Sequence, residues 1–188
     1  NSRWYSGCGI YRNVWLTLTH PVHVDLWGTY VTTPQVSDEE AIVSVCTSIK
    51  NEGTADAEVK VISALLDAEG NRVGETASVL PVSKDSVATY QQSIQVASPI
   101  LWSVDNPYLY TLKTEVWADD KLVDTYETKT GIRSFEFSAE KGFILNGKQV
   151  KINGVCMHHD LGCLGAAVNR RAIERQLEIL KGMGCNGI

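Results

Sequence analysis

Residues 151–162 read KINGVCMHHDLG, and this stretch decides how the chain is interpreted. Residues 150–155 are a short run with β-branched side chains, which favours a β-strand. His158, His159 and Asp160 follow at the point where that strand would end. This cluster of polar side chains directly after a strand is the first candidate for a functional site.

The residues that follow predict a helix. Asn169 is a favourable N-cap residue. Behind it, Ile173, Leu177 and Leu180 recur at helical spacing, with charged residues on the other faces. We therefore expect an amphipathic helix over residues 170–183.

A second strand is expected at residues 185–188, which read CNGI. Strand, loop, helix and strand make a βαβ unit, and such crossovers are right-handed. In a closed (β/α) barrel, the residues just after a strand lie on the catalytic face. The cluster that begins at His158 would sit there.

The remaining upstream sequence reads as antiparallel β-structure without a helical pattern. Residues 14–18 and 22–26 alternate between apolar and polar side chains, as half-buried strands do. Further strands are expected at residues 42–49, 59–65, 87–96, 109–116 and 122–130. Turn signals recur roughly every ten residues, which is typical of a β-sandwich. The dipeptide Asn146-Gly147 indicates a type I′ hairpin between two apolar runs.

Composition excludes several classes of partner. The 188 residues are 44% hydrophobic and 21% charged, with a net charge of −5. This acidic balance argues against nucleic acid as a partner, and no apolar run approaches the length of a membrane span. The cysteines are odd in number and irregularly spaced, which argues against a disulfide framework. They are Cys8, Cys46, Cys156, Cys163 and Cys185.

Several motifs then occur in a fixed order along the chain. Residues 3–12 read RWYSGCGIYR, residues 101–110 read LWSVDNPYLY, and residues 131–133 read GIR. They are followed by FILNG at residues 143–147 and GVCMHHD at residues 154–160. As a series, these motifs resemble glycoside hydrolase family two, the family of β-galactosidases, β-glucuronidases and β-mannosidases.

The resemblance implies a mainly β fold in three parts. Residues 1–28 would be the end of a jelly-roll sugar-binding domain, with a boundary near Trp27 and Gly28. Residues 29–137 would form an immunoglobulin-like antiparallel β-sandwich. Residues 138–188 would be the start of a (β/α)8 catalytic barrel, truncated after its first βα unit.

The resemblance also implies an activity. The parent protein would be a retaining exo-acting β-glycosidase, with β-galactosidase as the expected activity on terminal β-linked sugars of oligosaccharides. Retaining glycosidases need two carboxylates on either side of the scissile bond. In this family both are glutamates on later barrel strands, so we assign no catalytic residue here and expect the fragment to be inactive. The cytoplasm and the periplasm of a bacterium both stay open as its compartment.

His158 and Asp160 are the predicted substrate-binding residues. The resemblance implies that His158 lines the sugar subsite and donates a hydrogen bond to a substrate hydroxyl. Asp160 matches relatives that read His-Glu-Asp. The sequence departs from the family at Cys156 and Met157 and at His159, where Glu is common, so the resemblance leaves the sugar open among galactose, glucuronic acid and mannose.

Three other interpretations of the sequence compete with this one. A metal site could draw on Cys156, His158, His159, Asp160 and Cys163, which are all competent ligands. Neighbouring strand residues point to opposite sides and the spacing matches no zinc pattern, so no metal or cofactor is assigned; a cation of the parent enzyme would have no identifiable ligands here. A dinucleotide-binding fold lacks its glycine-rich turn.

The third alternative is a non-catalytic carbohydrate-binding or adhesion module built on the sandwich. The βαβ pattern argues against it, because such a module has no use for a helix that exposes Ile173, Leu177 and Leu180. The same apolar stripe predicts a homodimer of the fragment through residues 138–188, since burying an exposed apolar surface against a second copy lowers the free energy.

Overall fold

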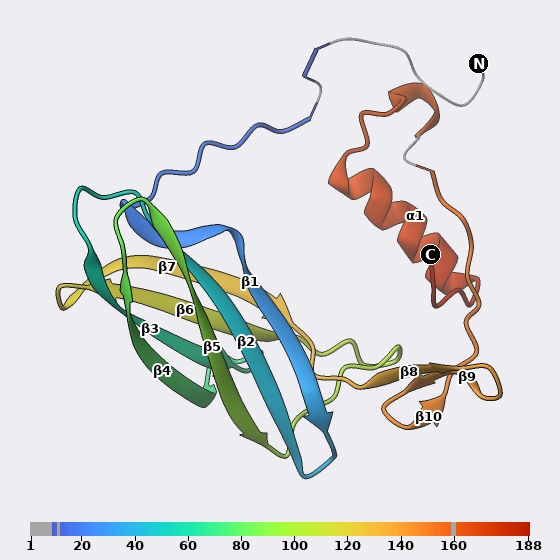
Figure 1. Ribbon diagram of the computed structural model, residues 1–188. Helices are drawn as coiled ribbons and strands as arrows, with labels where there is room; N and C mark the ends of the chain where they lie inside the picture. Colours follow the sequence, from blue (N-terminus) through green and yellow to red (C-terminus); the bar gives the residue numbers. More distant parts are fainter. Residues whose placement is uncertain (1–8, 11, 159–160) are drawn as a thin grey trace. The chain divides into compact units, whose positions relative to one another are not determined.

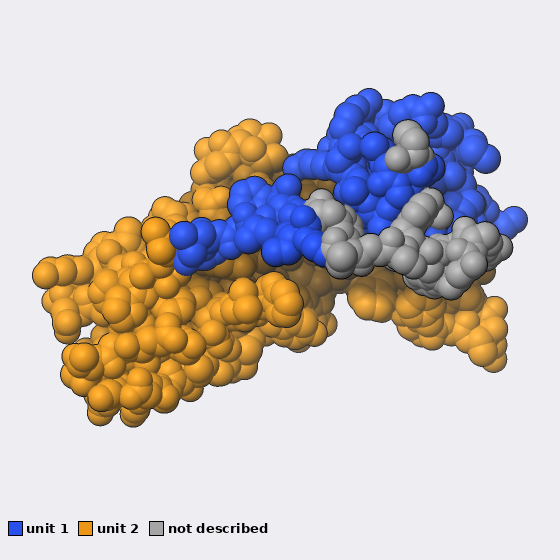
Figure 2. All heavy atoms as spheres, turned by 90° about the horizontal axis from the view of Figure 1, so that it is seen from above, with its two compact units in different colours: residues 1–17, 150–188 blue, residues 18–149 orange. Residues whose placement is uncertain are grey.

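The computed structural model describes residues 9–10, 12–158 and 161–188. The chain divides into two compact units, which are coloured separately in Figure 2. One is formed by Leu18–Gln149, and the other by Asn1–Thr17 together with Val150–Ile188.

The larger unit contains the predicted antiparallel β-sandwich (Figure 1). Its first sheet has the order β1 (Val22–Val36), β2 (Glu40–Asn51) and β5 (Ser86–Ala97). Its second sheet has the order β4 (Arg72–Val82), β3 (Ala57–Leu66), β6 (Tyr110–Ala118) and β7 (Lys121–Thr130). The mainly β, immunoglobulin-like fold expected from the sequence is therefore confirmed.

The core strands follow the alternation of the sequence. In β2, every second side chain from Ala41 to Asn51 is buried, and those between are half-buried. The edge strand β4 was not predicted, because several of its inward positions are small or polar residues such as Gly74 and Thr76. It is held by its pairing with β3 along almost its whole length.

A layer of polar side chains crosses the middle of the sandwich core. The buried apolar residues form two clusters, and on each of four core strands the residue between the clusters is polar: Thr47, Ser63, Gln92 and Thr114. Ser63 Oγ donates to Gln92 Oε1 at 2.7 Å, and Gln92 Nε2 donates to Val61 O at 3.0 Å. The hydroxyls of Thr47 and Thr114 have no hydrogen-bond partner among the described residues.

The predicted strand at residues 14–18 is absent. This segment is extended and exposed, with Leu16 86% accessible, and β1 begins only at Val22. An alternating sequence forms a strand only where a neighbour pairs with it, and in the described part of the chain no strand does so here. The expected domain boundary near Trp27 falls within β1, at a bulge where Trp27 has φ of 53°.

The hairpin around Asn146 has the predicted turn. β8 (Phe135–Ser138), β9 (Gly142–Leu145) and β10 (Lys148–Gln149) form a small sheet of order β10-β9-β8. Asn146 and Gly147 both have positive φ, 50° and 74°, as a type I′ turn requires. Asn146 also holds the hairpin to the sandwich, because its Nδ2 donates to Trp102 O at 3.0 Å and its Oδ1 accepts from Ser134 N at 3.0 Å. The expected boundary near Phe137 and Ser138 lies within β8.

The smaller unit contains η1 (Gly162–Leu164) and α1 (Arg170–Gly182). Asn169 caps α1 as predicted, with Oδ1 accepting from Ala172 N at 2.9 Å. The two expected strands are reduced to one parallel bridge between Gly154 and Gly187, because only this pair of residues meets in strand register. In the part of the chain that the structure describes, no helix is long and apolar enough to cross a membrane.

Candidate functional site

The structure places His158 on the exposed segment that leaves the Gly154 bridge. His158 thus follows the segment in which the first strand was expected and in which the described residues form only this bridge. Asp160, like His159, lies outside the described residues. The expected convergence of His158 and Asp160 on one substrate therefore stays a prediction.

Asn186 fixes the backbone that leads to His158. Its Oδ1 accepts from Asn153 N at 2.7 Å, and its Nδ2 donates to Lys151 O at 2.9 Å. Its own backbone N–H donates to Asn153 O at 3.0 Å. The side-chain amide of Asn186 thus bonds to the backbone on both sides of Ile152. In a sheet, the backbone of a neighbouring strand would make these two hydrogen bonds.

Sequence reasoning missed this role of Asn186. The available signal was a polar amide at the start of an expected strand, in the run CNGI. Asn is disfavoured inside strands, because its side chain competes for backbone hydrogen bonds. An Asn at such a position is therefore a candidate for bonding a neighbouring strand.

The bridge next to Asn186 joins two glycines, of which Gly187 has the less room for a side chain. A Cβ on Gly154 would lie 3.4 Å from Gly187 O, and a Cβ on Gly187 would lie 3.0 Å from Ile152 Cγ2. A larger residue at Gly187 would push Ile152 away. The two segments approach closely because neither carries a side chain at the crossing point.

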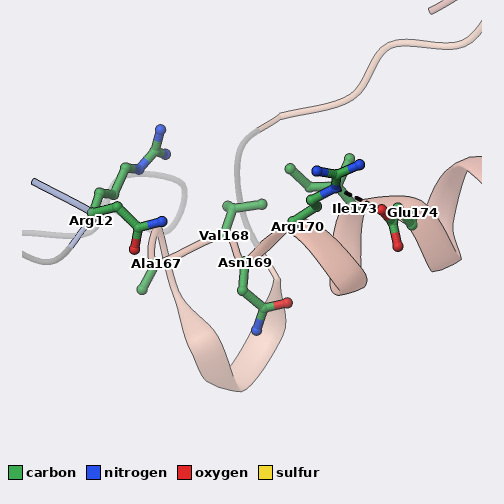
Figure 3. Close-up of a pocket in the computed structure, with 8 residues that line it drawn as sticks. Arg12, Ala167, Val168, Asn169, Arg170, Ile173 and Glu174 are labelled. Atoms are coloured by element: carbon green, nitrogen blue, oxygen red, sulfur yellow. Dashed lines mark hydrogen bonds and ion pairs between the residues drawn. The ribbon is translucent and has the colours of Figure 1, made fainter. Parts of the chain in front are cut away.

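A hollow of about 640 Å³ lies at the N-terminus of α1 (Figure 3). Arg12, Val168, Arg170, Ile173 and Glu174 line it, and Arg12 Nη2 donates to Ala166 O at 3.3 Å. Among the described lining residues Glu174 is the one carboxylate, and it is paired with Arg170 at 2.9 Å. A single paired carboxylate cannot supply the two groups that a retaining glycosidase uses.

The charges of α1 form a solvated network along the helix. Arg171 Nη1 donates to Glu178 Oε1 at 2.7 Å, and this hydrogen bond lowers the pKa of Glu178 and raises that of Arg171. A carboxylate held ionised by an arginine is unsuited to donate a proton to a leaving group. We therefore assign no acid–base role to this helix.

No metal site is apparent within the described residues. Among them, no three His, Cys, Asp or Glu side chains converge to hold an ion. Cys156 is exposed and His158 lies two residues further along. The other residues of the metal site considered from the sequence are not described by the structure. They are His159, Asp160 and the side chain of Cys163.

Comparisons with known proteins bear directly on this chain. It is 57% identical over all 188 residues to a β-galactosidase of Bacteroides ovatus, and it spans 22% of that protein. A solved glycosyl hydrolase family 2 member from Bacteroides cellulosilyticus superposes with a TM-score of 0.92 at 39% identity, covering 97% of this chain and 25% of that one. A solved β-glucuronidase of Bacteroides uniformis gives 0.88 at 28% identity, covering 98% and 23%.

The chain therefore spans about a quarter or less of the length of these relatives. The model of the family described as glycosyl hydrolases family 2 matches residues 22–133, which is more than half of the chain. The order of motifs along the sequence, the immunoglobulin-like sandwich and these similarities agree. The chain belongs to family 2 of the glycosyl hydrolases.

Proposed function

We propose that the chain is part of a retaining exo-acting β-galactosidase, which removes terminal β-linked galactose from oligosaccharides. The observation that carries this proposal is the 57% identity to a β-galactosidase across every residue of the chain. The β-glucuronidase structure, at 28% identity, supports the reaction class and favours a second candidate sugar, glucuronic acid.

The proposal divides the chain into three parts. The residues before β1 end a sugar-binding jelly roll, β1 to β7 form the sandwich, because Val22 and Val24 already pack in its core, and residues 138–188 begin the catalytic barrel. The parallel bridge between Gly154 and Gly187, with α1 between its two sides, supports the last assignment. Repeated β-strand and helix units of this kind build such a barrel.

In this proposal His158 donates a hydrogen bond to a hydroxyl of the bound sugar, and Asp160 accepts one. Hydrogen bonds of this type accelerate the reaction when they strengthen in the transition state. The two catalytic glutamates lie elsewhere in the parent protein. The chain alone therefore binds at most part of the substrate and has no hydrolytic activity.

The test uses the full-length protein that contains this chain. Hydrolysis of nitrophenyl β-galactoside and nitrophenyl β-glucuronide is measured for the wild type, for His158→Ala and for the matched control Met157→Leu. We expect a preference for the galactoside. His158→Ala should lower kcat/KM by roughly 10- to 100-fold, as the loss of one substrate hydrogen bond predicts, and Met157→Leu should change it little.

Each outcome decides one part of the proposal. A preference for the glucuronide would replace the sugar and keep the reaction class. Wild-type activity of His158→Ala would remove His158 from the subsite. Absence of activity on both substrates and on nitrophenyl β-mannoside would favour the carbohydrate-binding or adhesion module. Turnover by the 188-residue chain itself would contradict the assignment of the catalytic groups to other parts of the parent.

A further inference from the structure

The outer face of the four-stranded sheet carries a pocket that the proposed catalytic function does not use. Lys60 of β3 lies opposite Val79 of β4 and opposite Trp117 of β6, so these residues form a row across three strands. With Glu58, Asp119 and Asp120 they line a cavity of about 470 Å³. Small-molecule sites in proteins commonly have volumes of about 300 to 1,000 Å³.

The indole of Trp117 is held in place at this pocket. Its Nε1 donates to Glu115 Oε2 at 3.3 Å, and Lys113 Nζ lies 2.8 Å from Glu115 Oε1. Trp117 is half-buried, although the residues before and after it, Val116 and Ala118, are buried in the sandwich core. The ring is therefore a fixed apolar surface on the outside of the sheet, because its edge is anchored before any ligand arrives.

Charged side chains line the same pocket as this apolar surface. Asp119 and Asp120 form the two-residue turn between β6 and β7, with φ of 50° and 58°, and both are exposed, as are Glu58 and Lys60. Three carboxylates accept hydrogen bonds and one ammonium group donates them. Among the described residues, these three carboxylates do not converge as a group that could hold a metal ion.

An aromatic face bordered by hydroxyl-binding groups has the chemistry that recognises a pyranose ring. The apolar face of the sugar stacks on the indole, and its hydroxyls bond to the carboxylates and to Lys60. The surplus of negative charge disfavours an acidic sugar, because two like charges repel at short range. We propose that this pocket is a binding site for neutral pyranose sugars, centred on Trp117. The proposal does not depend on which sugar the parent enzyme cleaves.

The experiment uses the 188-residue chain and lactose as the probe. The indole N–H signal of each tryptophan is followed by ¹H–¹⁵N NMR during a lactose titration, and glucuronate serves as the anionic comparison. We expect lactose to shift the Trp117 signal in a saturable way and glucuronate to shift it far less. Trp117→Ala should weaken lactose binding by about tenfold or more, measured by saturation transfer to the sugar protons.

Two further variants keep the result interpretable. Trp15→Ala is the matched control, because Trp15 is 83% exposed and does not line this pocket. The double variant Asp119→Asn and Asp120→Asn keeps the left-handed turn, since Asn tolerates positive φ, and should weaken lactose binding while circular dichroism stays unchanged. An unshifted Trp117 signal, or equal loss of binding in Trp15→Ala, overturns the proposal. Failure here leaves the glycosidase proposal untouched, since that one is tested by hydrolysis.

Discussion

Replacing Thr47 and Thr114 by valine should stabilise the sandwich. Both residues are fully buried, and their hydroxyls have no hydrogen-bond partner within the described residues. A buried hydroxyl without a partner costs about 1 to 3 kcal/mol in measured protein series. Valine has nearly the shape of threonine, so it removes this cost without opening a cavity. We expect each substitution to raise the free energy of unfolding by about 1 kcal/mol, the low end of that range.

The two gains should add. Thr47 lies on β2 and Thr114 on β6, in different sheets, and neither hydroxyl has a hydrogen-bond partner among the described residues. Independent sites add to within a few tenths of a kcal/mol. The double variant should therefore gain about 2 kcal/mol, which for a chain of this size raises Tm by roughly 4 to 8 °C.

The assay is urea denaturation followed by circular dichroism, with Ser63→Ala as the matched control. Ser63 occupies the same polar layer but donates to Gln92, so its replacement leaves Gln92 without that donor. We expect this control to lose about 1 to 2 kcal/mol. A loss of stability in Thr47→Val or Thr114→Val would refute the reasoning, because it would mean that these hydroxyls make hydrogen bonds in the folded protein.

Three other predictions concern separate parts of the chain. Asn186→Ala should remove the two side-chain bonds to Asn153 and Lys151, and hydrogen exchange of the Asn153 amide should speed up while the sandwich amides keep their protection. The pKa of Glu115 is lowered, mainly by the hydrogen bond from Lys113. The ionised carboxylate therefore stabilises the fold above the pKa that Glu115 has in the unfolded chain, and this contribution is lost as the pH falls through its lower folded pKa. In Glu115→Gln, the free energy of unfolding should therefore fall less steeply as the pH is lowered. The apolar stripe of α1 predicts self-association of the chain through residues 138–188, because Leu177 is 38% exposed and none of the described helix residues is buried. Light scattering should detect this association at high concentration and should find none in a version that ends at Phe137. Monomers in both cases would exclude the association.

The strand predictions were correct where the local sequence shows which face of the strand is buried and which is exposed. In β2 and β3, most of the alternate positions on one face carry apolar side chains, and the structure buries that face. The predictions failed at residues 14–18, whose alternation is as clear but which pair with no described strand. They also omitted β4, whose weak alternation is compensated by pairing with β3. Pairing is a long-range property, so local alternation alone cannot supply it.

The candidate site shows the same division. His158 could be named in advance, because it follows a β-branched run and stands in a motif that resembles a known family. For Asn186 the sequence holds only the signal of a polar amide in an expected strand, and its partners Lys151 and Asn153 could not be named, since they are more than 30 residues away along the chain. The Trp117 pocket likewise depends on Lys60, Val79 and Trp117 meeting across three strands. Nothing in the local sequence around Trp117 indicates that row.

The sequence by itself determined the fold class, the type I′ turn at Asn146-Gly147 and the N-cap at Asn169. Each rests on a local preference of the backbone: period-two burial, tolerance of positive φ, or a side chain that accepts from a free N–H. Only the tertiary structure decided the polar layer through the core, the hydrogen bonds from Asn186 to Lys151 and Asn153, and the pocket that Trp117 lines on the outer face of the sheet. These features arise from the register between strands distant in sequence, because register sets which side chains share a layer and which donors find an acceptor.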